Sequence, residues 1–166
     1  MYKTIEDFIE DWKEESKSTV MVFKKVDDLE LKKKVHDNVR TPGKIAWHIT
    51  QTVTEMPKSA GIISTDPLEN MDIPESIKTI TDLYEKYSGE LVRSIKENWK
   101  DSDLNEVIEL YGQKWKRSKV LSVLLKHEIH HRAQMTVVMR LLNMKVPGVY
   151  GPSKEEWAKY GADPQE

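Results

Sequence analysis

The sequence contains no cysteine, which excludes a disulfide, a thiolate metal ligand and a cysteine nucleophile. Such a composition is usual in the reducing cytoplasm, where we expect the protein to reside. No apolar run approaches the roughly 20 residues that span a bilayer. The acidic opening, MYKTIEDFIEDW, does not resemble a signal peptide. We therefore expect a cytoplasmic protein with no membrane partner.

An excess of charge of either sign is also missing. The 26 Lys and Arg residues nearly balance the 28 Asp and Glu residues, so the formal net charge is −2. Intermixed charges are typical of solvated helix faces and not of a surface that binds nucleic acid. The basic run at residues 32–34 is interpreted in the same way, as a solvated helix end. We expect no nucleic-acid partner.

Apolar residues recur at intervals of three and four along most of the chain, a pattern typical of amphipathic helices. The pattern predicts four long helices, at about residues 4–25, 41–56, 74–99 and 118–143. The second helix is expected to begin with a threonine cap followed by proline, the third at a proline, and the fourth with a cap at Ser118.

The segments between these helices carry turn signals. Residues 57–73 contain two prolines and a glycine and are expected to form a loop. Residues 106–118 place β-branched and aromatic residues on both sides of Gly112, which predicts a short hairpin. We expect the turn-rich tail after Pro147 to pack back on the helices. The predicted fold is an all-α four-helix bundle, one domain over residues 1–166, with a short hairpin between the third and fourth helices.

Three histidines fall on the apolar sides of predicted helices. In the string HEIHH at residues 127–131, His127 and His131 are four positions apart, so they stack on one side of the helix, along its apolar stripe. His48 lies between apolar residues of the second helix, whereas His130 points about 60° or more away from the pair. An unsatisfied buried polar group costs about 1–3 kcal/mol. Three inward histidines can satisfy one another by binding a metal ion.

Three imidazole ligands suit a divalent ion, zinc or nickel in the first place, with iron and copper as further choices. A tetrahedral ion with three protein ligands keeps one position for water or substrate and can lower the pKa of a bound water to about 7. The alternative is that the histidines are ordinary core residues held by hydrogen bonds. Spacing alone leaves both interpretations open.

The same string matches H-E-x-x-H, the zinc metalloprotease motif in which glutamate is the general base. The longer metzincin motif requires glycine and histidine where this chain has Gln134 and Val137. A di-iron bundle requires two E-x-x-H motifs, and only Glu128 with His131 forms one. Both interpretations lack ligands, so we expect no protease.

Three neighbours of the histidines have alternative interpretations. Glu128 either supports the metal site or is a charge on the helix flank, paired with solvent or Arg132. Arg132 is interpreted as a surface ion-pair partner in preference to a contact for an anionic substrate. Gln134 lies one turn beyond His131 and either orients a ligand or substrate or bonds to a neighbouring helix as a core amide.

Three motifs together resemble the DinB/YfiT-like superfamily, a group of small bacterial proteins with a four-helix bundle. They are TPGKIAWHI at residues 41–49, HEIHHRAQM at 127–135 and VPGVYGPS at 146–153. Their order and spacing match the superfamily over nearly the whole chain, which makes the resemblance more specific than any one motif.

The resemblance implies a divalent metal held by His48, His127 and His131, and a homodimer. Superfamily members are often described as metal-dependent hydrolases, and relatives include enzymes that transfer or isomerise groups with a low-molecular-weight thiol. We therefore expect a metal-dependent hydrolase or a thiol-dependent S-transferase that acts on a small-molecule substrate. The alternative is a non-catalytic metal-binding module of the stress response. No residue identifies the substrate.

Overall fold

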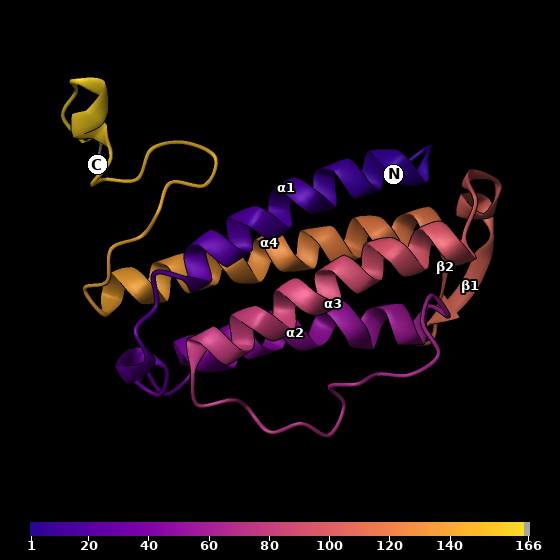
Figure 1. Cartoon of the computed structure of the whole chain (residues 1–166), viewed down its shortest axis with the longest axis horizontal. Coiled ribbons are helices and arrows are strands. Elements are labelled where there is room, and N and C mark those ends of the chain that lie inside the picture. Colours follow the sequence, from indigo (N-terminus) through magenta and orange to yellow (C-terminus); the bar gives the residue numbers. More distant parts are fainter. Residues whose placement is uncertain (165–166) are drawn as a thin grey trace.

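The structure, a computed structural model, describes residues 1–164. Its four long helices confirm the predicted all-α four-helix bundle (Figure 1). They are α1 (Ile5–Phe23), α2 (Pro42–Ser59), α3 (Ile77–Asn98) and α4 (Arg117–Leu141). Three short 3-10 turns lie outside them: η1 (Asp28–Glu30), η2 (Asp101–Asn105) and η3 (Trp157–Tyr160). In the described part of the chain, no helix is both long and apolar enough to cross a membrane.

The predicted hairpin between α3 and α4 is present. Strands β1 (Val107–Leu110) and β2 (Gln113–Lys116) pair in antiparallel fashion. The two turn residues, Tyr111 and Gly112, both have positive φ, at 52° and 70°, as expected of a two-residue turn that matches the twist of the strands. The Tyr111 hydroxyl donates to the Glu55 carboxylate of α2 at 2.7 Å. This bond attaches the hairpin to the bundle.

Local capping explains where α1 and α2 begin. The Thr4 side chain accepts a hydrogen bond from the backbone of Asp7, and the Asp7 carboxylate accepts one from the backbone of Thr4. At the start of α2, the Thr41 hydroxyl accepts from the backbone N–H of Lys44, and Pro42 occupies the first helical position, as predicted.

The predicted end of α2 was wrong. The loop was expected from residue 57, but Pro57 is buried inside the last helical turn and the helix ends at Ser59. A proline in this position removes one backbone donor. Its own carbonyl remains useful, because it accepts hydrogen bonds from the backbone of Ile62 and Ile63 at 2.9 and 3.4 Å, which folds the following chain back onto the helix end.

The predicted starts of α3 and α4 were also displaced. The third helix was expected at Pro74, but it begins at Ile77, because Ser76 supplies the capping oxygen. The fourth helix begins one residue before the expected cap, Ser118, which is buried in its first turn. The β2 strand leads directly into α4, and the backbone of Arg117 donates to the Glu106 carbonyl, so the hairpin and not a serine side chain positions the helix start.

Apolar side chains from all four helices fill the centre of the bundle. α2 packs against both α3 and α4, and α1 packs against the same two helices. The largest fully buried residues include Phe8, Trp12, Phe23, Ile49 and Tyr84. This core removes apolar surface from water without help from a ligand, so the helices around the histidines are held by their own packing.

The C-terminal segment only partly packs back on the helices. Figure 1 shows it leaving the end of α4 and running beyond the bundle. The Tyr150 hydroxyl donates to Glu15 of α1 at 2.8 Å, and Arg140 of α4 pairs with Glu155. Further along, Tyr160 of η3 is exposed. The prediction for the tail therefore holds for its first half.

Candidate metal centre

The three predicted histidines meet between α2 and α4. The Nε2 atoms of His48 and His127 are 3.2 Å apart, and the Nε2 atom of His131 lies 3.1 Å from each of them. One His comes from α2 and two come from successive turns of α4. The expectation that they share one point of the bundle is confirmed. These three residues form a group that could hold a metal ion.

Close packing at the start of α2 positions His48. The Gly43 N–H donates to the carbonyl of Leu31 at 2.9 Å. A Cβ atom at Gly43 would lie 2.9 Å from the same oxygen, so a larger residue would push the helix away from the preceding segment. One turn beyond His48, the Thr52 hydroxyl donates to the His48 carbonyl at 2.7 Å. The glycine of the TPGK stretch therefore lets the helix approach closely.

Partial burial keeps the three imidazoles neutral. Burial lowers the pKa of His48 and of His127 to about 4, with a further contribution from His131. Burial also lowers the pKa of His131. The Arg40 guanidinium contributes to the lowered pKa of all three rings. Near pH 7 each ring therefore offers a lone pair, the form of histidine that binds metal.

Gln134 orients one of these rings. Its side-chain oxygen accepts a hydrogen bond from Nδ1 of His131 at 2.8 Å, while its amide nitrogen lies 3.0 Å from Nε2 of His130. With its proton on Nδ1, His131 directs the lone pair of Nε2 toward the other two histidines. Gln134 is exposed and bonds within its own helix, so its interpretation as a core amide bonded to a neighbouring helix was wrong.

The donor set fits a divalent ion. Nitrogens bound to zinc at about 2.0–2.1 Å with tetrahedral angles lie about 3.3 Å apart, close to the separations of 3.1 to 3.2 Å between the Nε2 atoms. When His48 and His127 carry their protons on Nδ1, as His131 does, the three Nε2 lone pairs converge and no hydrogen bond among the rings satisfies them. A cation among the three nitrogens would satisfy all of them. His130, as expected, lies outside this group.

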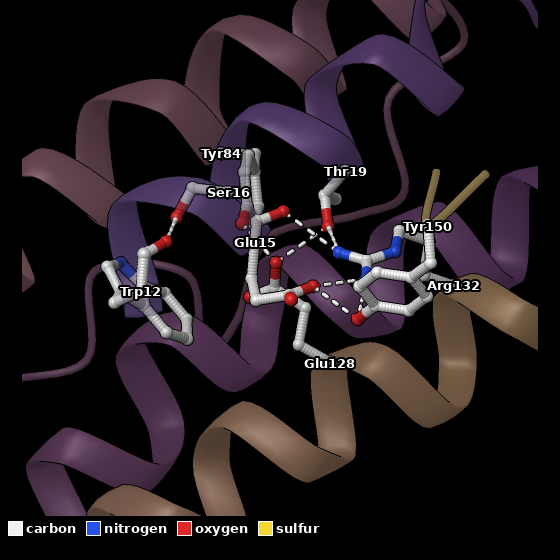
Figure 2. Close-up of polar contacts among 8 residues, drawn as sticks. All are labelled: Trp12, Glu15, Ser16, Thr19, Tyr84, Glu128, Arg132 and Tyr150. Atoms are coloured by element: carbon white, nitrogen blue, oxygen red, sulfur yellow. Dashed lines mark hydrogen bonds and ion pairs between the residues drawn. The ribbon is translucent and has the colours of Figure 1, made fainter. Parts of the chain in front are cut away.

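Arg132 is not a surface residue, and this prediction was wrong. Its side chain is 2% exposed and points toward α1. The guanidinium donates to the Glu15 carbonyl at 2.9 Å and to the Tyr150 hydroxyl at 2.7 Å, and it pairs with the Glu15 carboxylate. Figure 2 shows these groups gathered between α1, α4 and the tail. Arg132 therefore holds α1 and the tail against α4 and does not face a substrate.

Glu128 is likewise not a solvated flank charge. It is 3% exposed, and one carboxylate oxygen accepts hydrogen bonds from the hydroxyls of Thr19 and Tyr84, each at 2.6 Å (Figure 2). Burial raises its pKa. Its partners lie on α1 and α3, whereas the histidines face α2. The glutamate of the H-E-x-x-H string thus turns away from the candidate metal centre, unlike the base of a zinc protease.

Two hollows adjoin the histidines, one lined in part by His131 and the other by His48. The first, called here the apolar hollow, has a volume of about 530 Å³ and includes Val39, Arg40, His131, Gln134, Val137 and Leu141 in its lining. The second, called here the acidic hollow, has a volume of about 400 Å³ and includes His48, Glu55, Lys58, Asp66 and Glu69. Small molecules therefore have two approaches to the candidate centre.

Sequence reasoning missed the part played by Arg40. This residue lies in the connector before α2, where nothing in the helical periodicity indicates which way a side chain turns. The one available signal was its position immediately before the TPGK stretch that starts the helix carrying His48.

The sequence of the chain is similar to a known protein family and to a protein of Bacillus subtilis. The model of the DinB family matches residues 1–166. The uncharacterized protein YrdA of Bacillus subtilis is 35% identical over 163 residues, which cover 98% of each chain.

Solved structures agree. A DinB-like protein from Bacillus cereus ATCC 10987 is 34% identical, with a TM-score of 0.84 over 90% of this chain and 100% of the other. A second DinB-like protein, YjoA from Bacillus subtilis, is 16% identical, with a TM-score of 0.68 over 86% of this chain and 97% of its own. The second likeness concerns the fold alone.

Proposed function

This chain belongs to the DinB family, and from that premise we propose that it is a metal-dependent enzyme whose divalent ion is held by His48, His127 and His131. The observation that carries the proposal is the convergence of three Nε2 atoms within 3.2 Å of one another. We propose zinc or nickel as the ion, since imidazole ligands suit both. The DinB-like relatives support the fold around the site.

A divalent ion held in this way supplies a Lewis acid and lowers the pKa of a water or thiol that binds to it. The chain itself presents three neutral rings and fixes the Nδ1 proton of His131 through Gln134. Its two hollows, one beside His131 and one beside His48, have room for a small molecule. Because the sequence has no cysteine, thiol chemistry would use an external thiol. We propose a hydrolase or a thiol-dependent S-transferase.

The first experiment measures metal in protein purified without a histidine tag. We expect about one divalent ion per chain in the wild type and a sharp loss in His48→Ala, His127→Ala and His131→Ala. His36→Ala is the matched control, since His36 is exposed in the connector before α2. Full metal content in the His48→Ala protein would show that the three histidines do not act together.

The second experiment tests the reaction. The metal-loaded protein is offered bacillithiol or glutathione with monochlorobimane, and in parallel a panel of simple esters and amides. Conjugation that disappears in His127→Ala supports the transferase, and ester or amide turnover supports the hydrolase. Equal rates with and without metal across both panels would favour the non-catalytic metal-binding module.

Two further expectations accompany the proposal. Casein should not be cleaved, because the Glu128 carboxylate is buried against Thr19 of α1 and Tyr84 of α3 and does not face the histidines. A homodimer, which the family resemblance implies, is tested by sedimentation of the untagged protein over a range of concentrations.

A further inference from the structure

The apolar hollow joins the candidate metal centre to a single arginine. His131 and Gln134 line one side of it, and Arg40, from the connector before α2, lines another. Its volume of about 530 Å³ falls within the range of about 300–1,000 Å³ that small-molecule sites occupy. A molecule in this hollow would touch the edge of the histidine cluster and Arg40 at the same time.

The charge of this hollow is positive. Among the described residues that line it, none is acidic. Within residues 1–164, no carboxylate pairs with Arg40. Three neutral imidazoles would leave the full charge of a divalent ion uncompensated. An anion entering here would meet two centres of positive charge in a partly enclosed space.

The acidic hollow, which includes His48 in its lining, has a different character. Glu55, Asp66 and Glu69 line it together with one lysine. Like charges repel, so an anionic molecule would be disfavoured there. The two approaches to the histidines therefore discriminate between molecules by charge, and an anion is directed to the side of Arg40.

The walls of the apolar hollow favour a molecule that is not purely ionic. Val137 and Leu141, one turn apart on α4, are 59% and 63% exposed, and Val39 faces them from the connector. These side chains leave apolar surface in water that a hydrocarbon or aromatic group would cover. A guanidinium, in turn, matches a carboxylate geometrically, because it can donate two parallel hydrogen bonds.

We infer that the apolar hollow binds a small organic carboxylate with an apolar body, and that Arg40 is the residue that selects it. The carboxylate pairs with Arg40, the apolar body lies against Val39, Val137 and Leu141, and the rest of the molecule reaches toward His131. The part of this inference that concerns the reaction rests on the proposed function. The part that concerns Arg40 and the hollow is tested by binding alone.

The test is a calorimetric titration of the zinc-loaded wild type with three probes of one shape: 3-phenylpropionate, neutral 3-phenylpropionamide and cationic 3-phenylpropylamine. We expect the carboxylate to bind about tenfold more tightly than the amide, as a charged hydrogen bond commonly provides. Arg40→Gln should remove this preference. Lys44→Gln is the matched control, because Lys44 is a nearby exposed cation that does not line the hollow, and it should leave the preference unchanged.

Each outcome decides one part. Equal binding of carboxylate and amide, unchanged carboxylate binding in Arg40→Gln, or no binding of any probe would overturn the inference. The same titrations are repeated on protein stripped of metal, with metal content measured on every sample. If the wild type holds no metal but still prefers the carboxylate through Arg40, the proposed function fails and this inference stands. If metal is bound normally and the preference for the carboxylate is absent, this inference fails and the proposed function stands.

Discussion

Two faces of α4, each carrying a pair of partly or fully buried polar residues four positions apart, have opposite chemistry. One face presents His127 and His131 to α2, where they meet His48. The other presents Glu128 and Arg132 to α1 and α3. In the second cluster, donors meet acceptors: the guanidinium faces a carboxylate and a carbonyl, and hydroxyls face the other carboxylate. In the first, three atoms of the same kind face one another.

The difference separates a polar cluster that stabilises a fold from one that is prepared for a ligand. In the cluster of Glu128 and Arg132, complementary donors and acceptors satisfy most of the polar atoms within the protein, and the second carboxylate oxygen of Glu128 is the exception, buried without a partner. Three ring nitrogens of one kind, 3.1 to 3.2 Å apart, lack a complementary group within the protein when each presents a lone pair, and a cation from outside would supply it. Burial alone, which both faces share, does not distinguish the two cases; the identity of the partners does.

The largest effect is expected on the face of Glu128 and Arg132. Arg132→Met would leave the Glu15 carboxylate partly buried without its cation, and we expect a loss of about 3–5 kcal/mol in the free energy of unfolding, measured by urea denaturation. The metal content should remain that of the wild type, because the histidines face another helix. Arg93→Met, at an exposed position of α3, is the control and should change stability by less than about 0.5 kcal/mol. Equal midpoints for the two variants would contradict the structural role of Arg132.

On the histidine face, the expected stabilisation comes only with metal. At a free metal concentration of 100 times Kd, the free energy of unfolding should rise by about 2.7 kcal/mol in the wild type. It should not rise in His48→Ala. The metal-free wild type should remain helical by circular dichroism, because the core of the bundle does not involve the ion. A disordered metal-free protein would contradict the distinction between the two faces, because it would show that the bundle needs the ion in order to fold.

A smaller effect is expected from the residue that orients His131. Gln134→Leu removes the acceptor for the Nδ1 proton, 2.8 Å away, and should weaken metal affinity about tenfold, which corresponds to about 1.4 kcal/mol. A competition titration with a chelating dye measures it. Gln113→Leu, in the hairpin, should have wild-type affinity. If the two variants bind metal equally, the hydrogen bond does not contribute to the site.

Mild acid should act on the two faces in opposite directions, with the smallest net effect because the imidazoles are half-exposed and solvent screens them. The pKa of His48 and of His127 falls from 6.5 to about 4 on folding, so their contribution to stability is present above pH 6.5 and is lost as the pH falls toward 4. The pKa of Glu128 is raised above 4.5, so its folded carboxyl takes up a proton first and stability increases on acidification.

Unfolding of the metal-free protein at several pH values between 7 and 4.5 measures the sum of these contributions. Glu128→Gln removes the opposing contribution, so its stability should decline more steeply with acid than that of the wild type. Parallel profiles for the two proteins would show that Glu128 does not titrate in this range.

The histidine cluster was predictable because its spacing and its apolar surroundings agree. His127 and His131 lie along the stripe of α4, and His48 lies in the stripe of α2, so any bundle that packs these stripes together brings the rings close. The placement of Arg132 was not predictable in this way. A glutamate and an arginine four apart on a helix flank resemble an exposed ion pair, and only the docking of α1 buries them.

Helix boundaries show the same division between local and tertiary signals. The caps at Thr4 and Thr41 are local, because each threonine side chain bonds to the backbone only three residues further along the chain. The end of α2 and the start of α4 depend on what lies next to them: the chain that bonds to the carbonyl of Pro57, and the hairpin that leads into Arg117. Sequence patterns do not contain those neighbours.

The separation of the histidines along the chain has a consequence for folding kinetics. His48 and His127 are 79 positions apart, with α3 and the hairpin between them. A complete site exists only after α2 and α4 have docked, so an ion would join the protein late, after the main barrier to folding. Interactions that are absent from the folding transition state slow unfolding and leave the folding rate nearly unchanged. Metal should therefore lengthen the lifetime of the native state without speeding its formation, unlike a covalent cross-link, which also constrains the unfolded chain.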